Sequence, residues 1–155
     1  MVSKFPDNYP RVTPALCVHD AKAAIEFYTS VLGATERERY EYDGVIGHAE
    51  LMVGDSVIML SDEFPEMNVV SPKTLGGTGV AIMVYVEDVD AVFAAALKAG
   101  ATELRPVEKQ FYGDRSGQFL DPWGHRWAVS THVEDVDHDE LHRRADEAWE
   151  AEAHA

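Results

Sequence analysis

One pattern occurs twice in this chain. The segment VHDAKAAIEFYTSVLGATE begins at Val18, and VEDVDAVFAAALKAGATE begins at Val86, about 68 residues later. Each copy indicates the end of an apolar strand, an acidic helix start, an amphipathic helix and a Gly-Ala-Thr-Glu exit. Each is followed by two strands around a tight turn. Two copies with so long a period do not make a solenoid. The sequence therefore predicts two related βαβββ modules with a cleft between them.

Turn and cap residues place the expected elements within each half. In the first half we expect a strand at 12–18, a helix between Asp20 and Gly33, and strands at 35–42, 45–53 and 57–61. In the second half we expect a strand at 80–86, a helix at 89–99, and strands near 102–104, 116–120 and 126–131. The connection 62–79, rich in Gly and Pro, is either a linker or a mobile flap over a site.

The predicted organisation is one domain over residues 1–136, built from modules at about 9–62 and 79–132, followed by an acidic helix at 137–155. That helix carries a stripe of Leu141, Ala145, Ala148 and Trp149. We expect the stripe to pack on the domain or on a partner subunit. The alternative is that an exposed Trp149 is itself a recognition element.

Charge excludes some classes of partner. The formal net charge is −15, so no basic patch is available to displace counterions from nucleic acid or to bind an anionic membrane. The acidity favours a cationic or neutral small molecule, although it can equally serve solubility alone. No apolar run approaches the ~20 residues of a membrane span. A single cysteine and an N-terminus without a signal-peptide pattern indicate a cytoplasmic protein.

The IEFYTSVLGA helix and the DPWGHRW turn, within paired βαβββ halves, resemble the vicinal oxygen chelate superfamily. This superfamily includes glyoxalase I, bleomycin-resistance proteins and extradiol dioxygenases, and the resemblance runs from about Tyr9 to Glu134. HAELMVGDSVIMLSDEFPE and QFYGDRSGQFLDPWGHRW are similar to an uncharacterised glyoxalase-like subgroup. The resemblance implies an α+β fold in which tandem modules form a curved, mixed eight-stranded sheet with helices on its outer face. It also implies a homodimer whose clefts combine strands from both chains.

The resemblance also implies where a metal would bind. In metal-dependent members four strand positions in the cleft supply His and Glu ligands, and here these positions fall on Thr13, Met59, Ala81 and Ala128. None of these residues is a usual ligand of a divalent transition metal. We therefore expect no cofactor, and a divalent metal is disfavoured.

Strand alternation predicts which side chains line the cleft. The candidate ligand-binding residues on the strands are Arg11, Thr13, Met52, Met59, Met83, Tyr85 and Arg126. Flexible thioethers suit a flat aromatic or polyketide-like ligand, but methionines also fill closed cores. In the loop FYGDR, Tyr112 and Asp114 are further candidates, with an ordinary turn as the alternative. We assign Trp123, His125 and Trp127 to packing, and His132 receives no role.

His48 and Glu50 form an acid–base pair on one strand face. A carboxyl facing a methionine-rich wall would lose water, which raises its pKa and suits a general base. Glu50 could instead form a structural ion pair with Arg11 or Arg126. The pair could also hold a metal away from the family's usual positions, although no third ligand is evident.

Three functions remain open. The leading hypothesis is metal-independent binding of a small aromatic or cationic compound, as in sequestration by bleomycin-resistance proteins, a form of antibiotic resistance. The second is a cofactor-free isomerase, epimerase or lyase that uses Glu50 as base, with His48 or Tyr85 assisting. The third is a metal-dependent glyoxalase-like or dioxygenase-like enzyme with a non-standard site at His48 and Glu50. Nucleophile elbows, phosphate loops and dinucleotide fingerprints are absent from the sequence.

Overall fold

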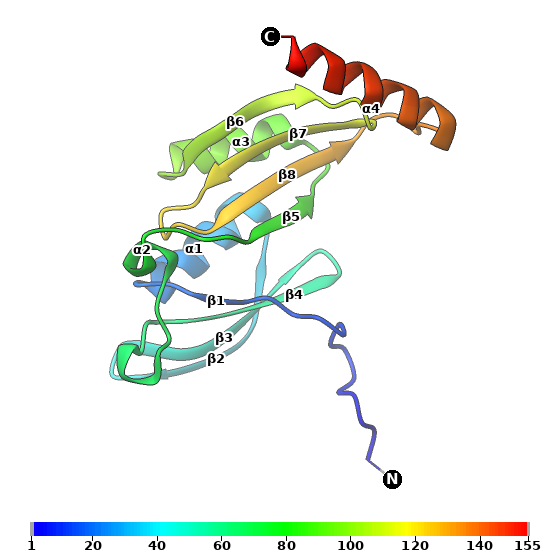
Figure 1. Ribbon diagram of the computed structural model, residues 1–155. Helices are drawn as coiled ribbons and strands as arrows, with labels where there is room; N and C mark the ends of the chain where they lie inside the picture. Colours follow the sequence, from blue (N-terminus) through cyan, green and yellow to red (C-terminus); the bar gives the residue numbers. More distant parts are fainter. Residues whose placement is uncertain (1, 155) are drawn as a thin grey trace. The chain divides into compact units, whose positions relative to one another are not determined.

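The computed structural model describes residues 2–154, which separate into two compact units. The first unit, here called the first module, comprises the chain up to Gly79 together with Pro122–His125. The second module comprises Val80–Asp121 and the chain from Arg126 onward. Each module contains one four-stranded sheet, and its strands are labelled in Figure 1.

The two modules have the same topology, which confirms the tandem βαβββ prediction. The first contains β1 (Ala15–Cys17), α1 (Ala21–Leu32), β2 (Thr35–Tyr42), β3 (Val45–Val53) and β4 (Ser56–Ser61). The second contains β5 (Ala81–Tyr85), α3 (Val89–Lys98), β6 (Thr102–Lys109), β7 (Asp114–Leu120) and β8 (Arg126–His132). Strand orders are β1-β4-β3-β2 and β5-β8-β7-β6, with the first pair parallel in each sheet. The fold is α+β, and its eight strands form two hydrogen-bonded sheets of four.

Local sequence signals explain the boundaries of these elements. Asp20 caps α1 by accepting a hydrogen bond from the backbone of Ala23, and Gly33 ends it in a left-handed conformation. Asp43 and Gly44 both have positive φ, as a tight hairpin between right-twisted strands requires. In the second module, Asp88 caps α3 in the same way as Asp20 caps α1.

Two strands, β1 and β6, differ most in length from the prediction. β1 begins at Ala15 rather than at residue 12, and Pro14 directly precedes it. β6 continues to Lys109 rather than ending near residue 104, although it contains Pro106. Proline lacks the N–H that a ladder needs, but β6 is an edge strand, where proline is tolerated. The connection 62–79 also contains the short helices η1 (Pro65–Met67) and α2 (Pro72–Leu75).

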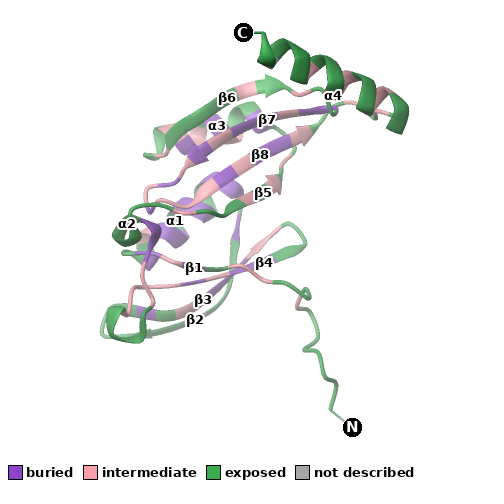
Figure 2. Cartoon of the chain, in the orientation of Figure 1, coloured by how far each residue is buried: buried purple, intermediate pink, exposed green. Residues whose placement is uncertain are grey.

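Each sheet has one face covered by a helix. In the first module α1 covers β3, where Ala49 and Leu51 are fully buried. Trp123, from the turn between β7 and β8, packs edge-on against Phe27 of α1, with ring centroids 5.6 Å apart. This contact confirms the packing role expected for Trp123. Figure 2 shows that burial is concentrated in the inner strands and the helices facing them.

The second module is packed in the same way. Phe93 of α3 lies edge-on to Phe119, and its ring also touches Gly117 so closely that a Cβ there would lie 2.9 Å from it. Trp127 is buried as expected, and its indole N–H donates to Asp121 at 2.9 Å. The Phe93 contacts place the odd-numbered residues of β7 on the helix side, and the register, with Trp127 opposite Phe119, places those of β8 there too. The even-numbered residues therefore form the opposite, helix-free face.

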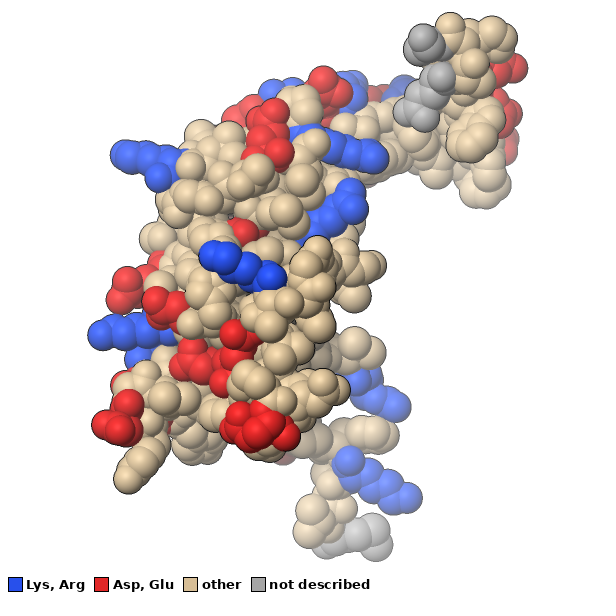
Figure 3. Space-filling view, turned by 60° about the vertical axis from the view of Figure 1, so that its left-hand side comes forward, with Lys and Arg blue, Asp and Glu red and all other residues tan. Residues whose placement is uncertain are grey.

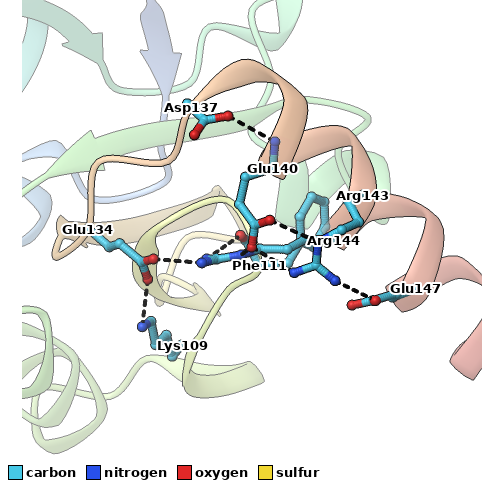
Figure 4. Close-up of polar contacts among 8 residues, drawn as sticks. All are labelled: Lys109, Phe111, Glu134, Asp137, Glu140, Arg143, Arg144 and Glu147. Atoms are coloured by element: carbon cyan, nitrogen blue, oxygen red, sulfur yellow. Dashed lines mark hydrogen bonds and ion pairs between the residues drawn. The ribbon is translucent and has the colours of Figure 1, made fainter.

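The C-terminal helix α4 (His138–Ala153) belongs to the second module. Its Arg144 reaches Glu134 at 2.7 Å and the carbonyl of Phe111, and Lys109 pairs with the same Glu134 (Figure 4). Trp149, further along the helix, is 76% exposed within this chain. Among residues 2–154, no helix combines the length and apolarity needed to cross a membrane.

Candidate functional site: two carboxylate, tyrosine and histidine clusters

The helix-free face of the first module carries the expected strand residues. In the register of the sheet Glu50 lies opposite Met59, and Met59 lies opposite Ala15. Directly opposed residues share a face, and alternation adds His48 and Met52 to it. Met52 and Met59 are both half-buried. The register therefore agrees with the sequence prediction that these residues of β3 and β4 point to the same face of the sheet.

Glu50 is the centre of a cluster on this face. It is only 5% exposed, yet its carboxylate has three partners. It accepts a hydrogen bond from the Tyr9 hydroxyl at 2.6 Å and lies 3.0 Å from Nε2 of His48 and 3.3 Å from the guanidinium of Arg37. Arg37 in turn stacks over the Tyr9 ring and donates to the carbonyl of Asn8. The cluster thus ties the N-terminal segment to the sheet.

These contacts correct two expectations about Glu50. Its pKa is lowered, not raised, because the Tyr9 and His48 hydrogen bonds and the Arg37 charge favour the carboxylate more than burial disfavours it. Its ion-pair partner is Arg37, from the neighbouring strand β2. The guanidinium of Arg11 lies over the Phe5 ring instead, and that of Arg126 binds the side-chain oxygen of Gln118. Glu50 is therefore poorly suited to act as a general base.

A similar cluster lies on the helix-free face of the second module. Asp114, at the start of β7, is 3% exposed and accepts a hydrogen bond from the Tyr85 hydroxyl at 2.7 Å. Its other oxygen lies 2.8 Å from Nδ1 of His132, which is opposite it on β8. Nε2 of His132 contacts Asp135 at 2.9 Å. These two carboxylates raise the pKa of His132, and the bond to Asp114 raises that of Tyr85.

The backbone holds Asp114 in place. The preceding residue, Gly113, has a φ of 97°, and its carbonyl accepts the N–H groups of Val133 and Glu134. A side chain at Gly113 would collide with the carbonyl of Glu134, so only glycine fits. Asp114 was expected in a loop beside Arg115, but it is buried in a strand, and Arg115 pairs with Asp90 of α3 instead.

The remaining candidates take up different positions. Met83 and Tyr85 lie on the helix-free face of the second module and are 50% and 60% exposed. Tyr112 lies edge-on to Phe111 in the loop before β7. Arg11 and Thr13 precede β1, so strand alternation does not determine the directions of their side chains. The physical reason is Pro14, which interrupts the strand pattern on its N-terminal side.

Three cluster members were missed in the sequence. Tyr9 lies before the first strand, Arg37 lies on a polar edge strand, and His132 ends β8. Only His132 could have been found from the sequence. Asp114 lies at the start of β7 and His132 at the end of β8, so antiparallel pairing of these two strands brings them opposite each other. Tyr9 meets Glu50 across 41 positions, a separation that no periodicity reveals.

The four residues that the sequence resemblance assigned to metal-ligand positions do not have side chains suited to a divalent transition-metal ion. Met59, Ala81 and Ala128 lie in strands with ordinary register, and Thr13 precedes β1. None supplies an imidazole, carboxylate or thiolate. Within the described part of the chain, no group of three or more His, Cys, Asp or Glu side chains is arranged to hold a metal ion.

Comparison with known proteins places this architecture in a family. Residues 11–129 match the Glyoxalase/Bleomycin resistance protein/Dioxygenase superfamily, and the chain belongs to it. Among its relatives is the uncharacterised protein Mb0911c of Mycobacterium bovis, 42% identical over 136 residues, which are 85% of this chain and 90% of the relative.

Solved structures share the fold. TioX from Micromonospora sp. ML1 is 26% identical with a TM-score of 0.61, and the match covers 80% of this chain and 99% of TioX. The fosfomycin resistance protein FosX from Mesorhizobium loti is 17% identical with a TM-score of 0.59, over 79% of this chain and 91% of FosX. At that identity the likeness to FosX concerns the fold alone. The match to the family model over residues 11–129 confirms the superfamily assignment predicted from the sequence.

Proposed function

We propose that this protein binds a small cationic aromatic compound and sequesters it without converting it. The observation that carries this proposal is the pair Met83 and Tyr85 on the helix-free face of the second module. Large apolar side chains exposed together on a strand face indicate a binding surface. The polarisable thioether of Met83 adapts to flat ligands, and the Tyr85 ring offers a π-face.

The fixed position of Tyr85 supports this proposal. Its hydroxyl is bound to the buried Asp114, so the ring is pre-ordered and loses little conformational freedom on binding. The surrounding charge favours a cation. The formal net charge is −15, and the face shown in Figure 3 carries groups of acidic side chains among separate Lys and Arg residues. Membership of a superfamily that includes bleomycin-resistance proteins is compatible with this role.

The proposal is tested with ethidium as a cationic aromatic probe and anilinonaphthalene sulfonate as an anionic one, both followed by fluorescence. We expect saturable ethidium binding and weak binding of the sulfonate. Met83→Lys should abolish ethidium binding by adding a positive charge, whereas Met83→Leu should retain it. Tyr42→Ala removes an exposed aromatic residue of the first module and should change nothing. Loss of ethidium binding in Tyr42→Ala but not in Met83→Lys would overturn the proposed location.

A second candidate function is cofactor-free proton transfer, as in an isomerase, epimerase or lyase. The observation that favours it is the pairing of a buried carboxylate with a partly exposed histidine, at Glu50 and His48. In such a pair the carboxylate orients the ring and the histidine exchanges the proton. His48, not Glu50, is then the acid–base residue.

This alternative has its own test. Carbonyl compounds with an acidic α-hydrogen are incubated with the protein in deuterium oxide, and exchange is followed by NMR. If His48 is catalytic, His48→Gln should slow exchange by about 10²- to 10⁴-fold. Absence of exchange in the wild type across the panel favours sequestration.

A further inference from the structure

Two histidines at the start of α4 converge outside both clusters. His138 and His142 are four residues apart, so their side chains lie one above the other on the same helix face. Their Nε2 atoms are 3.2 Å apart, and their ring centroids are 4.4 Å apart with planes inclined at 62°. Both side chains are exposed, so solvent ions can reach them.

The distance between these nitrogens has a specific chemical meaning. Two Nε2 atoms at 3.2 Å can share one hydrogen, with one ring donating and the other accepting. The same separation suits two ligands of one ion. With bonds of about 2.1 Å to a common metal, the two nitrogens would subtend an angle of about 100°, close to that of tetrahedral or octahedral sites.

We propose that His138 and His142 form a two-histidine site for a borderline divalent transition metal such as Cu²⁺, Ni²⁺ or Zn²⁺. Each Nε2 lone pair forms one bond to the ion. The ring that carried the shared hydrogen on Nε2 becomes the Nδ1–H tautomer, so no net proton is lost from the neutral pair. Water completes the coordination. Imidazole nitrogen binds these ions, whereas Mg²⁺ and Ca²⁺ prefer oxygen ligands.

The setting of the pair supports a cation. Asp137 and Asp139 flank His138, and the Asp139 carboxylate lies 3.7 Å from Nδ1 of that ring, which is too far for a hydrogen bond but places negative charge beside the site. The helix itself is held to the module by Arg144, two residues beyond His142. The backbone that spaces the two rings is therefore ordered before an ion arrives, which reduces the entropic cost of binding.

The helix also carries its own reporter. Trp149 is seven residues after His142, which places it on nearly the same face about 10 Å along the axis. It is exposed, whereas Trp123 and Trp127 are buried. Bound Cu²⁺ is expected to quench Trp149 fluorescence. The Trp149→Phe variant shows how much of the total quenching comes from this residue.

The test uses untagged full-length protein titrated with CuSO₄ by fluorescence and with ZnCl₂ by calorimetry. We expect one ion per chain. Mutating a residue that only hydrogen-bonds to a metal ligand commonly lowers metal affinity by about 10- to 100-fold. His138→Gln and His142→Gln each remove a ligand itself, so each should weaken binding by at least about tenfold. His154→Gln changes another exposed histidine at the far end of α4 and should bind as the wild type does.

The outcomes are decisive in both directions. Equal loss in the two single variants, with retention in His154→Gln, supports the site. No saturable binding by the wild type overturns it. Binding that persists unchanged in the double variant His138→Gln/His142→Gln also overturns it, because the ion then lies elsewhere. Circular dichroism without metal checks that α4 is folded in every variant.

Discussion

The Tyr85 hydroxyl donates a hydrogen bond of 2.7 Å to the Asp114 carboxylate, which is almost completely buried. The two residues come from β5 and β7, the neighbours of β8 on either side. His132 of β8 contacts the same carboxylate. One buried acid therefore links three strands on the face where we place the ligand.

Tyr85→Phe should destabilise the protein although the side chain is largely exposed. The substitution removes the hydroxyl donor from the buried Asp114 carboxylate, which among the described residues then has only His132 as a side-chain partner. We expect the free energy of unfolding to fall by about 1 to 2 kcal/mol. Urea denaturation measures it. Tyr42→Phe is the matched control, since Tyr42 is 87% exposed, and its effect should stay within about 0.5 kcal/mol. Equal effects of the two substitutions would contradict the role of the Asp114 bond.

The pH dependence of stability should report on His132. Its pKa is raised in the folded state, first by the bond to Asp135 and then by the bond to Asp114. A raised folded pKa means that the charged form stabilises the fold. This contribution is complete below the unfolded value of about 6.5 and is lost as pH rises through the higher folded value.

We therefore compare urea midpoints of the wild type and His132→Gln between about pH 5.5 and 8.5, where the carboxylates stay ionised. The difference between the urea midpoints of the wild type and His132→Gln should become smaller as pH rises. A midpoint difference that stays constant or grows with pH would show that the fold does not stabilise the charged form of His132.

The titration of Glu50 should distinguish a structural carboxylate from a general base. Carboxyl-carbon NMR should give a midpoint below the ordinary value of about 4.3, because Tyr9, His48 and Arg37 all stabilise the ionised form. In Tyr9→Phe the largest of these contributions is lost, and the midpoint should move upward. A wild-type midpoint above the ordinary value would restore Glu50 as a candidate base.

Attachment of α4 should depend on Arg144 and not on its neighbour Arg143. Arg144 joins the helix to Glu134 and to the Phe111 carbonyl, whereas the partners of Arg143, Glu140 and Glu147, lie within α4 (Figure 4). The Arg144 and Lys109 contacts lower the pKa of Glu134 to about 2.

Amide hydrogen exchange over α4 measures this difference. Arg144→Gln should accelerate exchange along the helix, and Arg143→Gln should have a smaller effect confined to its own turns. Similar acceleration in both variants would mean that the helix depends on its internal ion pairs alone.

Much of the fold could be predicted because its signals are local. Asp20 and Gly33 bound α1, and Asp43-Gly44 sets the β2–β3 hairpin, each through its own backbone preference. Prediction was poorer at β6, which was expected near residues 102–104 but continues through Pro106 to Lys109. Pro106 has no backbone N–H, and an edge strand tolerates this because one of its sides has no neighbouring strand to accept a hydrogen bond. A single sequence does not show which strand lies at the edge.

The site was less predictable because its chemistry depends on distant partners. Alternation placed Glu50 and His48 on the correct face, but the direction of the Glu50 pKa shift is set by Tyr9 and Arg37, which come from other segments. Asp114 was singled out as a loop residue, whereas its burial depends on Gly113 allowing the chain after β8 to approach closely.

The most direct test of the proposed function follows the methionine methyl groups by NMR during ethidium titration. Met83 should shift saturably with one ethidium per chain. Met67, which is 70% exposed on η1 of the first module, should stay unchanged as an internal reference. Movement of Met83 alone would place the ligand on the helix-free face of the second module. An unchanged Met83, or equal shifts of Met67 and Met83, would contradict the account.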